Sequence, residues 1–116
     1  MYRVELSKRA FRDLRRLDHP VRKRLLNLLE RELAADPQPP NLDVKALVGR
    51  SPWLRLRRGE HRIIYRPLTE PELVRLKAAE SEGFLVERIV DRRDLARAAA
   101  TLPRYDTPKP SGLVRE

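Results

Sequence analysis

The chain has 116 residues, which suits one small domain, and its net charge of +9 comes from 26 Lys and Arg against 17 Asp and Glu. It contains no cysteine, which excludes disulfides, thiolate metal sites and a cysteine nucleophile. The sequence shows no apolar run that predicts a membrane span or a signal peptide. We therefore expect a cytoplasmic protein with a polyanionic partner and no membrane partner.

The positive charge is concentrated in parts of the chain. Residues 8–35 carry nine basic and four acidic side chains, and residues 45–66 carry seven basic and one acidic. Residues 67–87 have the opposite balance, with two basic and five acidic side chains. This distribution predicts a local positive field, which solubility alone does not require.

The N-terminal third is expected to form a strand followed by two helices. Residues 2–6 alternate apolar and polar side chains, as strands do, and Ser7 is a good N-cap for the next helix. Pro20 then opens a second helix after a break. Residues 36–44 hold three prolines and are expected to form a loop. The helical spacing of apolar residues predicts a core that includes Leu14, Leu17, Leu25 and Leu28.

Residues 53–66, WLRLRRGEHRIIYR, predict a β-hairpin that carries five arginines. Gly59 and Glu60 suit a two-residue type II′ turn, because glycine takes the first position. In that register one face is apolar and is expected in the core; it holds Leu54, Leu56, Ile63 and Tyr65. The other face is basic and holds Trp53, Arg55, Arg57, Arg62, Ile64 and Arg66.

The basic face places Arg57 directly opposite Arg62. Like charges in opposed positions destabilise a strand pair, so a hairpin that keeps such a pair is expected to bind an anion there. The alternative is a solvated surface in a chain that uses arginine freely. The concentration of charge on one side of one hairpin favours the anion site.

The remaining segments complete an α+β fold. Thr69 and Glu72 have the spacing of a capping box, which predicts a short helix over 71–80. Residues 84–90 are expected to form a strand beside the hairpin, and residues 91–102 to run into a C-terminal helix. The two N-terminal helices then pack on one face of a mainly antiparallel sheet, and the other face stays partly open and carries the arginines.

Three segments, SKRAFRDLRRL, LRLRRGEHRIIYR and VERIVDRRDLARA, together resemble the RelE/ParE family of toxins from bacterial type II toxin–antitoxin systems. The resemblance rests on their order and spacing, and it implies a microbial RNase-like (RelE-like) fold with a C-terminal helix. It also implies a cognate antitoxin as partner, in a toxin–antitoxin complex such as a heterotetramer. We expect a single toxin domain over 1–102 and a flexible tail over 103–116, which is rich in proline and small polar residues.

In the RelE branch, the resemblance implies cleavage of mRNA on the ribosome, with no metal and no cofactor. Charge builds on the phosphate as the RNA 2′-hydroxyl attacks it, so preorganised cations are the main contribution of the protein. Matching positions imply that Arg55, Arg62 and Arg93 are these catalytic cations, and Asp91 joins the expected catalytic set as a candidate base. The positions expected to bind RNA are Trp53, Arg57, Arg66 and Arg92. Trp53 is equally compatible with stacking on a base and with packing in the protein.

The family pattern is incomplete in this chain. Lysine, histidine and tyrosine positions of some members are occupied here by Trp53, Asp91, Arg92, Ala96 and Ala99. Arginine cannot accept a proton near neutral pH, so either another residue is the general base, or proton transfer is slow or is helped by the ribosome. The candidates are Asp91, His61 and Tyr105, although Asp91 is as well suited to pair with an arginine and His61 to pack on the core face.

These departures keep two other functions open. One is a ParE-like toxin with the same fold, which inhibits DNA gyrase by protein–protein contact without cleaving RNA. The other is a basic nucleic-acid-binding module with no catalytic activity.

Overall fold

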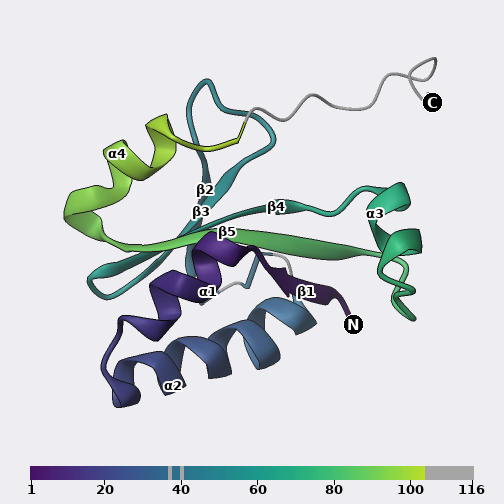
Figure 1. Cartoon of the computed structure of the whole chain (residues 1–116), viewed down its shortest axis with the longest axis horizontal. Coiled ribbons are helices and arrows are strands. Elements are labelled where there is room, and N and C mark those ends of the chain that lie inside the picture. The colour runs from purple at the N-terminus through teal and green to yellow at the C-terminus, as the bar shows by residue number, and fades with distance from the viewer. Residues whose placement is uncertain (37, 40, 104–116) are drawn as a thin grey trace.

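The computed structural model describes residues 1–36, 38–39 and 41–103. Its centre is a five-stranded sheet in the order β1-β5-β4-β3-β2, with helices packed against it (Figure 1). β1 runs parallel to β5, and all other neighbouring strands are antiparallel. None of the helices in the described part of the chain is both long and apolar enough to cross a membrane. The α+β architecture predicted from the sequence is confirmed.

The N-terminal segment forms β1 (Arg3–Leu6) and α1 (Lys8–Arg15). Ser7 caps α1 as predicted, because its hydroxyl accepts a hydrogen bond from the Ala10 amide at 3.0 Å. The same hydroxyl donates a hydrogen bond to the Glu87 carbonyl at 2.9 Å. One residue therefore starts the helix and attaches it to the sheet.

The second helix, α2 (His19–Asn27), begins after Asp18 and carries Pro20 in its first turn, as predicted. It continues as a π-helical turn, η1 (Leu28–Leu33). This wider turn lets three leucines reach the core, and all three are buried: Leu28, Leu29 and Leu33.

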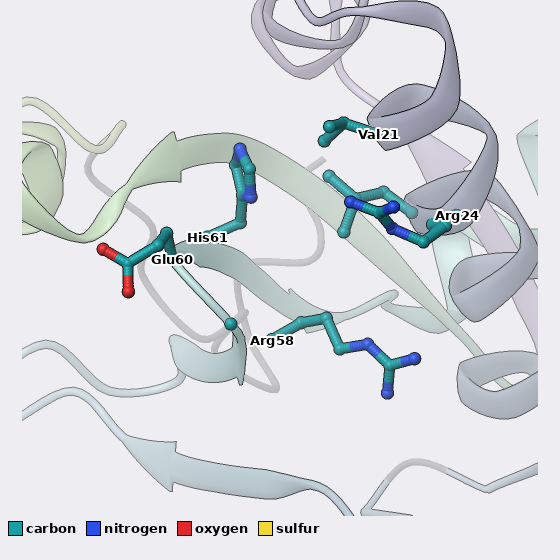
Figure 2. Close-up of a pocket in the computed structure, with 7 residues that line it drawn as sticks. Val21, Arg24, Arg58, Glu60 and His61 are labelled. Atoms are coloured by element: carbon teal, nitrogen blue, oxygen red, sulfur yellow. The ribbon is translucent and has the colours of Figure 1, made fainter.

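The hairpin of β3 (Leu54–Arg58) and β4 (His61–Pro67) has the predicted register. Leu56 lies opposite Ile63, and Arg57 lies opposite Arg62. Gly59 has a φ of 58°, a conformation that L-residues rarely adopt, so the turn requires glycine there. His61 points toward the side of α2, away from the basic face, as Figure 2 shows.

One strand was not predicted. β2 (Asp43–Ala46) pairs antiparallel with β3 and forms the outer edge of the sheet. The loop predicted over 36–44 therefore ends earlier than expected. Four residues are too few for a periodic pattern, and the pairing partner rather than the local sequence makes this segment extended.

The chain then forms α3 (Glu70–Arg75), β5 (Gly83–Asp91), a 3₁₀ turn η2 (Arg92–Asp94) and α4 (Leu95–Ala100). The predicted capping box is present in α3, which is shorter than the predicted helix.

Glycine is required at the start of β5, because β1 passes unusually close to it. An added Cβ at Gly83 would lie 2.5 Å from the carbonyl oxygen of Arg3, its partner in the ladder. Further along, the ladder between β4 and β5 contains a bulge. Ile64 lies opposite Arg88 and Tyr65 opposite Val86, so Glu87 is the extra residue on β5.

The sheet has an apolar cluster on each face. The larger core lies between the sheet and the helices α1, α2 and η1, and it contains the predicted residues Leu14, Leu25, Leu28, Leu56, Ile63 and Tyr65. Leu17 and Leu54, which were also predicted to be buried, are only partly buried and pack against its rim. On the other face, α4 covers a second cluster of Trp53, Ile64, Val90 and Ala98. The basic face is therefore less open than predicted, because a helix packs on part of it.

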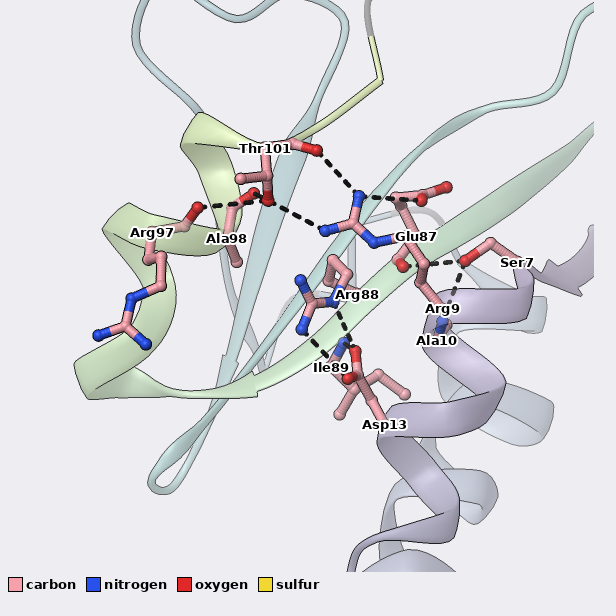
Figure 3. Close-up of polar contacts among 10 residues, drawn as sticks. All are labelled: Ser7, Arg9, Ala10, Asp13, Glu87, Arg88, Ile89, Arg97, Ala98 and Thr101. Carbon is pink, nitrogen blue, oxygen red and sulfur yellow. Dashed lines mark hydrogen bonds and ion pairs between the residues drawn. The ribbon is translucent and has the colours of Figure 1, made fainter.

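β1 covers only the first part of the free edge of β5, and α1 covers the next part (Figure 3). The Asp13 carboxylate accepts a hydrogen bond from the Ile89 amide at 2.9 Å. It also accepts two bonds from the Arg88 guanidinium, at 2.8 and 3.2 Å. Asp13 is 9% exposed, so these contacts are shielded from water. The edge that β1 leaves unpaired is thus satisfied by a side chain.

We expect the Asp13→Ala substitution to lower the free energy of unfolding by about 3 kcal/mol, because it leaves an amide and a partly buried guanidinium without their acceptor. Urea denaturation measures this change. Asp94→Ala is the control, because Asp94 forms an exposed ion pair of 3.9 Å with Arg97 and its loss should cost little. Equal losses in the two variants would contradict the role given to Asp13.

Candidate anion-binding site

The candidate site is the arginine cluster on the basic face near the hairpin turn. Arg55 and Arg57 come from β3, Arg62 comes from β4, and Arg92 follows the end of β5. The predicted opposition of Arg57 and Arg62 is present in the ladder. Three strands thus bring four cations to one end of the sheet.

Arg62 lies at the centre of this cluster. Its pKa is lowered from the usual value by partial burial first, then by the neighbouring positive charges of Arg57 and Arg55, with a smaller effect from Arg92. Its guanidinium donates hydrogen bonds to the carbonyl oxygens of Gly59 at 2.9 Å and His61 at 3.0 Å. These neutral acceptors orient the group without neutralising its charge, so it remains able to bind an anion.

Two acidic side chains form ion pairs with the flanking arginines. Arg55 forms an ion pair with Asp43 of β2 at 3.3 Å, and its side chain is 15% exposed. Arg92 forms an ion pair with Glu60 of the turn at 2.8 Å. Neither acidic residue was among the predicted site residues. With these two carboxylates counted, the cluster holds four positive and two negative charges.

The structure does not bring Arg93 and Asp91 to this cluster as predicted. Arg93 bonds to Asp91 instead, with 3.0 Å between Nε and Oδ1, and its side chain is 82% exposed. The charged groups that act on Arg62 include Arg92. Asp91 pairs with His61 in the ladder and so belongs to the opposite face from Arg62. We therefore include Arg92 in the cluster as the cation that follows β5.

Trp53 and Arg66, which were predicted to bind RNA, lie in the protein interior. Trp53 is 4% exposed and packs under α4, so its ring is not available to stack on a base. Arg66 donates two hydrogen bonds to the Glu72 carboxylate, at 2.9 and 2.8 Å, and its guanidinium lies 5.8 Å from the centre of the Trp53 ring. Sequence alternation placed both residues on the correct face, but it could not show that α4 and α3 cover them.

The structure gives no strong general base beside Arg62 within residues 1–36, 38–39 and 41–103. Asp91 accepts hydrogen bonds from the amide and the side chain of Arg93, and these lower its pKa and weaken it as a base. His61 lies on the other side of the hairpin. Tyr105, the third candidate, lies outside the described residues.

No group of three or more His, Cys, Asp or Glu suited to hold a metal ion occurs in the described part of the chain. The positive charge of the site is supplied by guanidinium groups, which offer planar pairs of donors to phosphate oxygens.

A family model described as the ParE toxin of type II toxin–antitoxin systems matches residues 4–79. The chain belongs to this toxin family. No curated protein sequence matches the chain significantly. The matched range includes both N-terminal helices and the whole hairpin, but it ends before Arg92.

Solved structures of toxin–antitoxin complexes share the fold. The RelB–RelE complex of Methanococcus jannaschii matches with a TM-score of 0.57 and 19% identity, over 81% of this chain and 96% of that chain. The RelBE2 complex of Mycobacterium tuberculosis matches with 0.60 and 21%, over 78% and 98%. The RelE–RelB complex of Pyrococcus horikoshii matches with 0.58 and 23%, over 78% and 94%. The predicted RelE-like fold is confirmed.

The contact between Arg66 and Glu72 predicts a specific loss of stability in acid. Arg66 and the capping bonds of Thr69 lower the pKa of Glu72 to about 2, from 4.5. Because the pKa is depressed in the folded state, the pair stabilises the protein fully above pH 4.5, and this stabilisation is lost as the pH falls toward 2. We expect Glu72→Gln to be less stable than the parent at pH 7 and closer to it near pH 2. Chemical denaturation across this range measures the difference; a constant difference would contradict the assignment.

Proposed function

We propose that this chain is an endoribonuclease toxin that cleaves mRNA on the ribosome and uses no metal ion. The observation that carries the proposal is the cluster around Arg62, where like charges are held together by the backbone and by too few carboxylates to neutralise them. Such an arrangement costs stability unless an anion binds, and a phosphodiester is an anion whose oxygens match paired guanidinium donors.

The proposed reaction is a transesterification within the RNA. The 2′-oxygen forms a bond to the adjacent phosphorus, the bond from phosphorus to the 5′-oxygen breaks, and a 2′,3′-cyclic phosphate and a 5′-hydroxyl result. One proton leaves the 2′-oxygen and one is taken up by the 5′-oxygen. Arg62, with Arg55 and Arg92 beside it, would stabilise the additional negative charge on the phosphorane oxygens.

Proton transfer is the step to which the described residues contribute least. Arginine remains protonated near neutral pH, and the carboxylate of Asp91 is a poor base because Arg93 holds its pKa low. We therefore propose that the base in this reaction is a group of the ribosome or water. Activity on free RNA would then be much weaker than activity on ribosome-bound mRNA.

A second function is favoured by a different observation, the match to a family model described as a ParE toxin. In this alternative the chain inhibits DNA gyrase by protein–protein contact, and the arginine cluster binds an acidic surface. This alternative needs no general base, which agrees with the lack of a strong base beside Arg62 in the described part of the chain.

In either case we propose a cognate antitoxin as the partner that holds the toxin inactive. The structural neighbours are complexes of a RelE toxin with a RelB antitoxin. A net charge of +9 favours an acidic or amphipathic antitoxin segment that folds as it wraps this domain. Co-expression with the product of a neighbouring gene should relieve growth arrest caused by the toxin.

We expect Arg62→Ala to lower the rate of mRNA cleavage about 100- to 1,000-fold, because the transition state loses one hydrogen-bond donor. Primer extension on programmed ribosomes measures the rate. Arg62→Lys should also be impaired, since an ammonium cannot replace a planar pair of donors. Arg75→Ala is the control, because this exposed arginine lies on α3 and is not part of the cluster.

Two outcomes would contradict these assignments. If Arg62→Ala cleaves ribosome-bound mRNA as fast as the parent, the role of Arg62 is wrong and the nuclease activity stands. If the parent protein causes gyrase-linked DNA breaks and no cuts in mRNA, the second function replaces the first.

A further inference from the structure

A second set of cations lies on the other side of the same hairpin turn. A cavity of about 230 Å³ lies between α2 and the turn. Arg24 enters it from α2, while Arg58 and His61 flank Gly59 and Glu60 (Figure 2). Its apolar wall is formed by Val21 and Leu25.

The cavity continues along α2. A neighbouring cavity of about 440 Å³ shares Arg24 and Arg58 and adds Arg31. Together the two cavities form a groove, which we call the α2 groove, lined by three arginines and one histidine. A concave surface with cations and apolar walls strengthens the local positive field.

Few acidic groups oppose these cations. Within the described residues, no ion pair engages Arg24, Arg31 or Arg58. Glu60 also borders the first cavity, but its carboxylate points away from the arginines in Figure 2 and pairs with Arg92. Glu32 borders the second cavity and is the remaining acidic side chain in the α2 groove.

We propose that the α2 groove is a second phosphate-binding site, which holds the backbone of the single-stranded RNA whose reacting phosphate lies at the Arg62 cluster. This inference rests on the proposed nuclease function. The ligand class is a phosphodiester backbone, bound by charge and by guanidinium donors without reading of bases.

The hairpin register places the two sites back to back. Arg57 and Arg58 are consecutive on β3, as are His61 and Arg62 on β4, and consecutive residues of a strand point to opposite faces. The two sites are therefore separated only by the thickness of the hairpin and connected around its two-residue turn. A strand of RNA that leaves the Arg62 cluster and passes the turn reaches the α2 groove. Its next phosphates then bind Arg58 and Arg24.

The experiment measures binding of single-stranded RNA that carries 2′-O-methyl groups and so cannot be cleaved. A dinucleotide and a longer strand are compared over a range of salt concentrations. The variants are the Arg24→Gln/Arg58→Gln double substitution, Arg62→Gln, and Arg75→Gln as a control that removes one exposed positive charge on α3. Thermal unfolding of each variant confirms that it is folded.

For the longer strand, the double variant should bind at least about tenfold more weakly than the parent. The slope of log affinity against log salt should fall by about 0.7 for each phosphate that the variant no longer neutralises. For the dinucleotide, which fills only the Arg62 cluster, the double variant should bind like the Arg75→Gln control. Arg62→Gln should weaken binding of both.

Failure of this inference is distinguishable from failure of the proposed function. If the double variant binds the longer strand like Arg75→Gln while Arg62→Gln weakens it, the α2 groove is not an RNA site and the nuclease proposal is unaffected. If an acidic peptide binds the α2 groove of the parent, and the double variant keeps the parent's affinity for RNA, the inference is likewise overturned. If the parent protein binds neither RNA, the inference is overturned, and the nuclease proposal is decided separately by primer extension on programmed ribosomes.

Discussion

The structure depends on how the backbone groups at the free edge of β5 are hydrogen-bonded where β1 no longer pairs with that edge. β5 pairs with β4 from Phe84 to Asp91 with one bulge, but β1 ends at Leu6 and covers only the first residues of β5. Asp13 closes the next part by accepting bonds from the Ile89 amide and the Arg88 guanidinium. Arg88 lies opposite Ile64 on the face that α4 covers, whereas α1 packs on the other face. One buried carboxylate therefore connects both faces of the sheet and fixes the strand that leads to Arg92.

The arginine cluster at the end of that strand combines fixed geometry with incomplete charge compensation. Asp43 and Glu60 hold Arg55 and Arg92 at 3.3 and 2.8 Å. Arg62 instead donates to carbonyl oxygens, which direct its donors but leave its charge in place. Full pairing of these arginines would make the protein more stable and remove the site. Under the proposed function, the residual positive charge is a cost in stability that serves binding.

Sequence reasoning succeeded where a local pattern determines the structure. Glycine first in a two-residue turn and strict alternation on both sides fixed the hairpin register, so the opposition of Arg57 and Arg62 could be predicted. Ser7 and Thr69 cap helices through contacts three residues away, which a sequence shows directly. Burial of Trp53 could not be predicted in this way, because it depends on α4 packing across the basic face. Nor could Asp43 be assigned to Arg55, since β2 has no pattern of its own.

The arginines of the hairpin show why composition alone cannot locate a site. Arg62 and Arg66 lie on the same strand and alternate to the same face, and a sequence gives no reason to separate them. Arg66 is 7% exposed, and a carboxylate, Glu72, binds it through two hydrogen bonds, so its charge is neutralised inside the protein. Arg62 is partly exposed and is surrounded by other cations. Burying a charge requires a partner of opposite sign, whereas a charge that binds a ligand must lack one. The partner of each arginine, rather than its position in the strand, therefore separates the structural arginine from the one available to an anion.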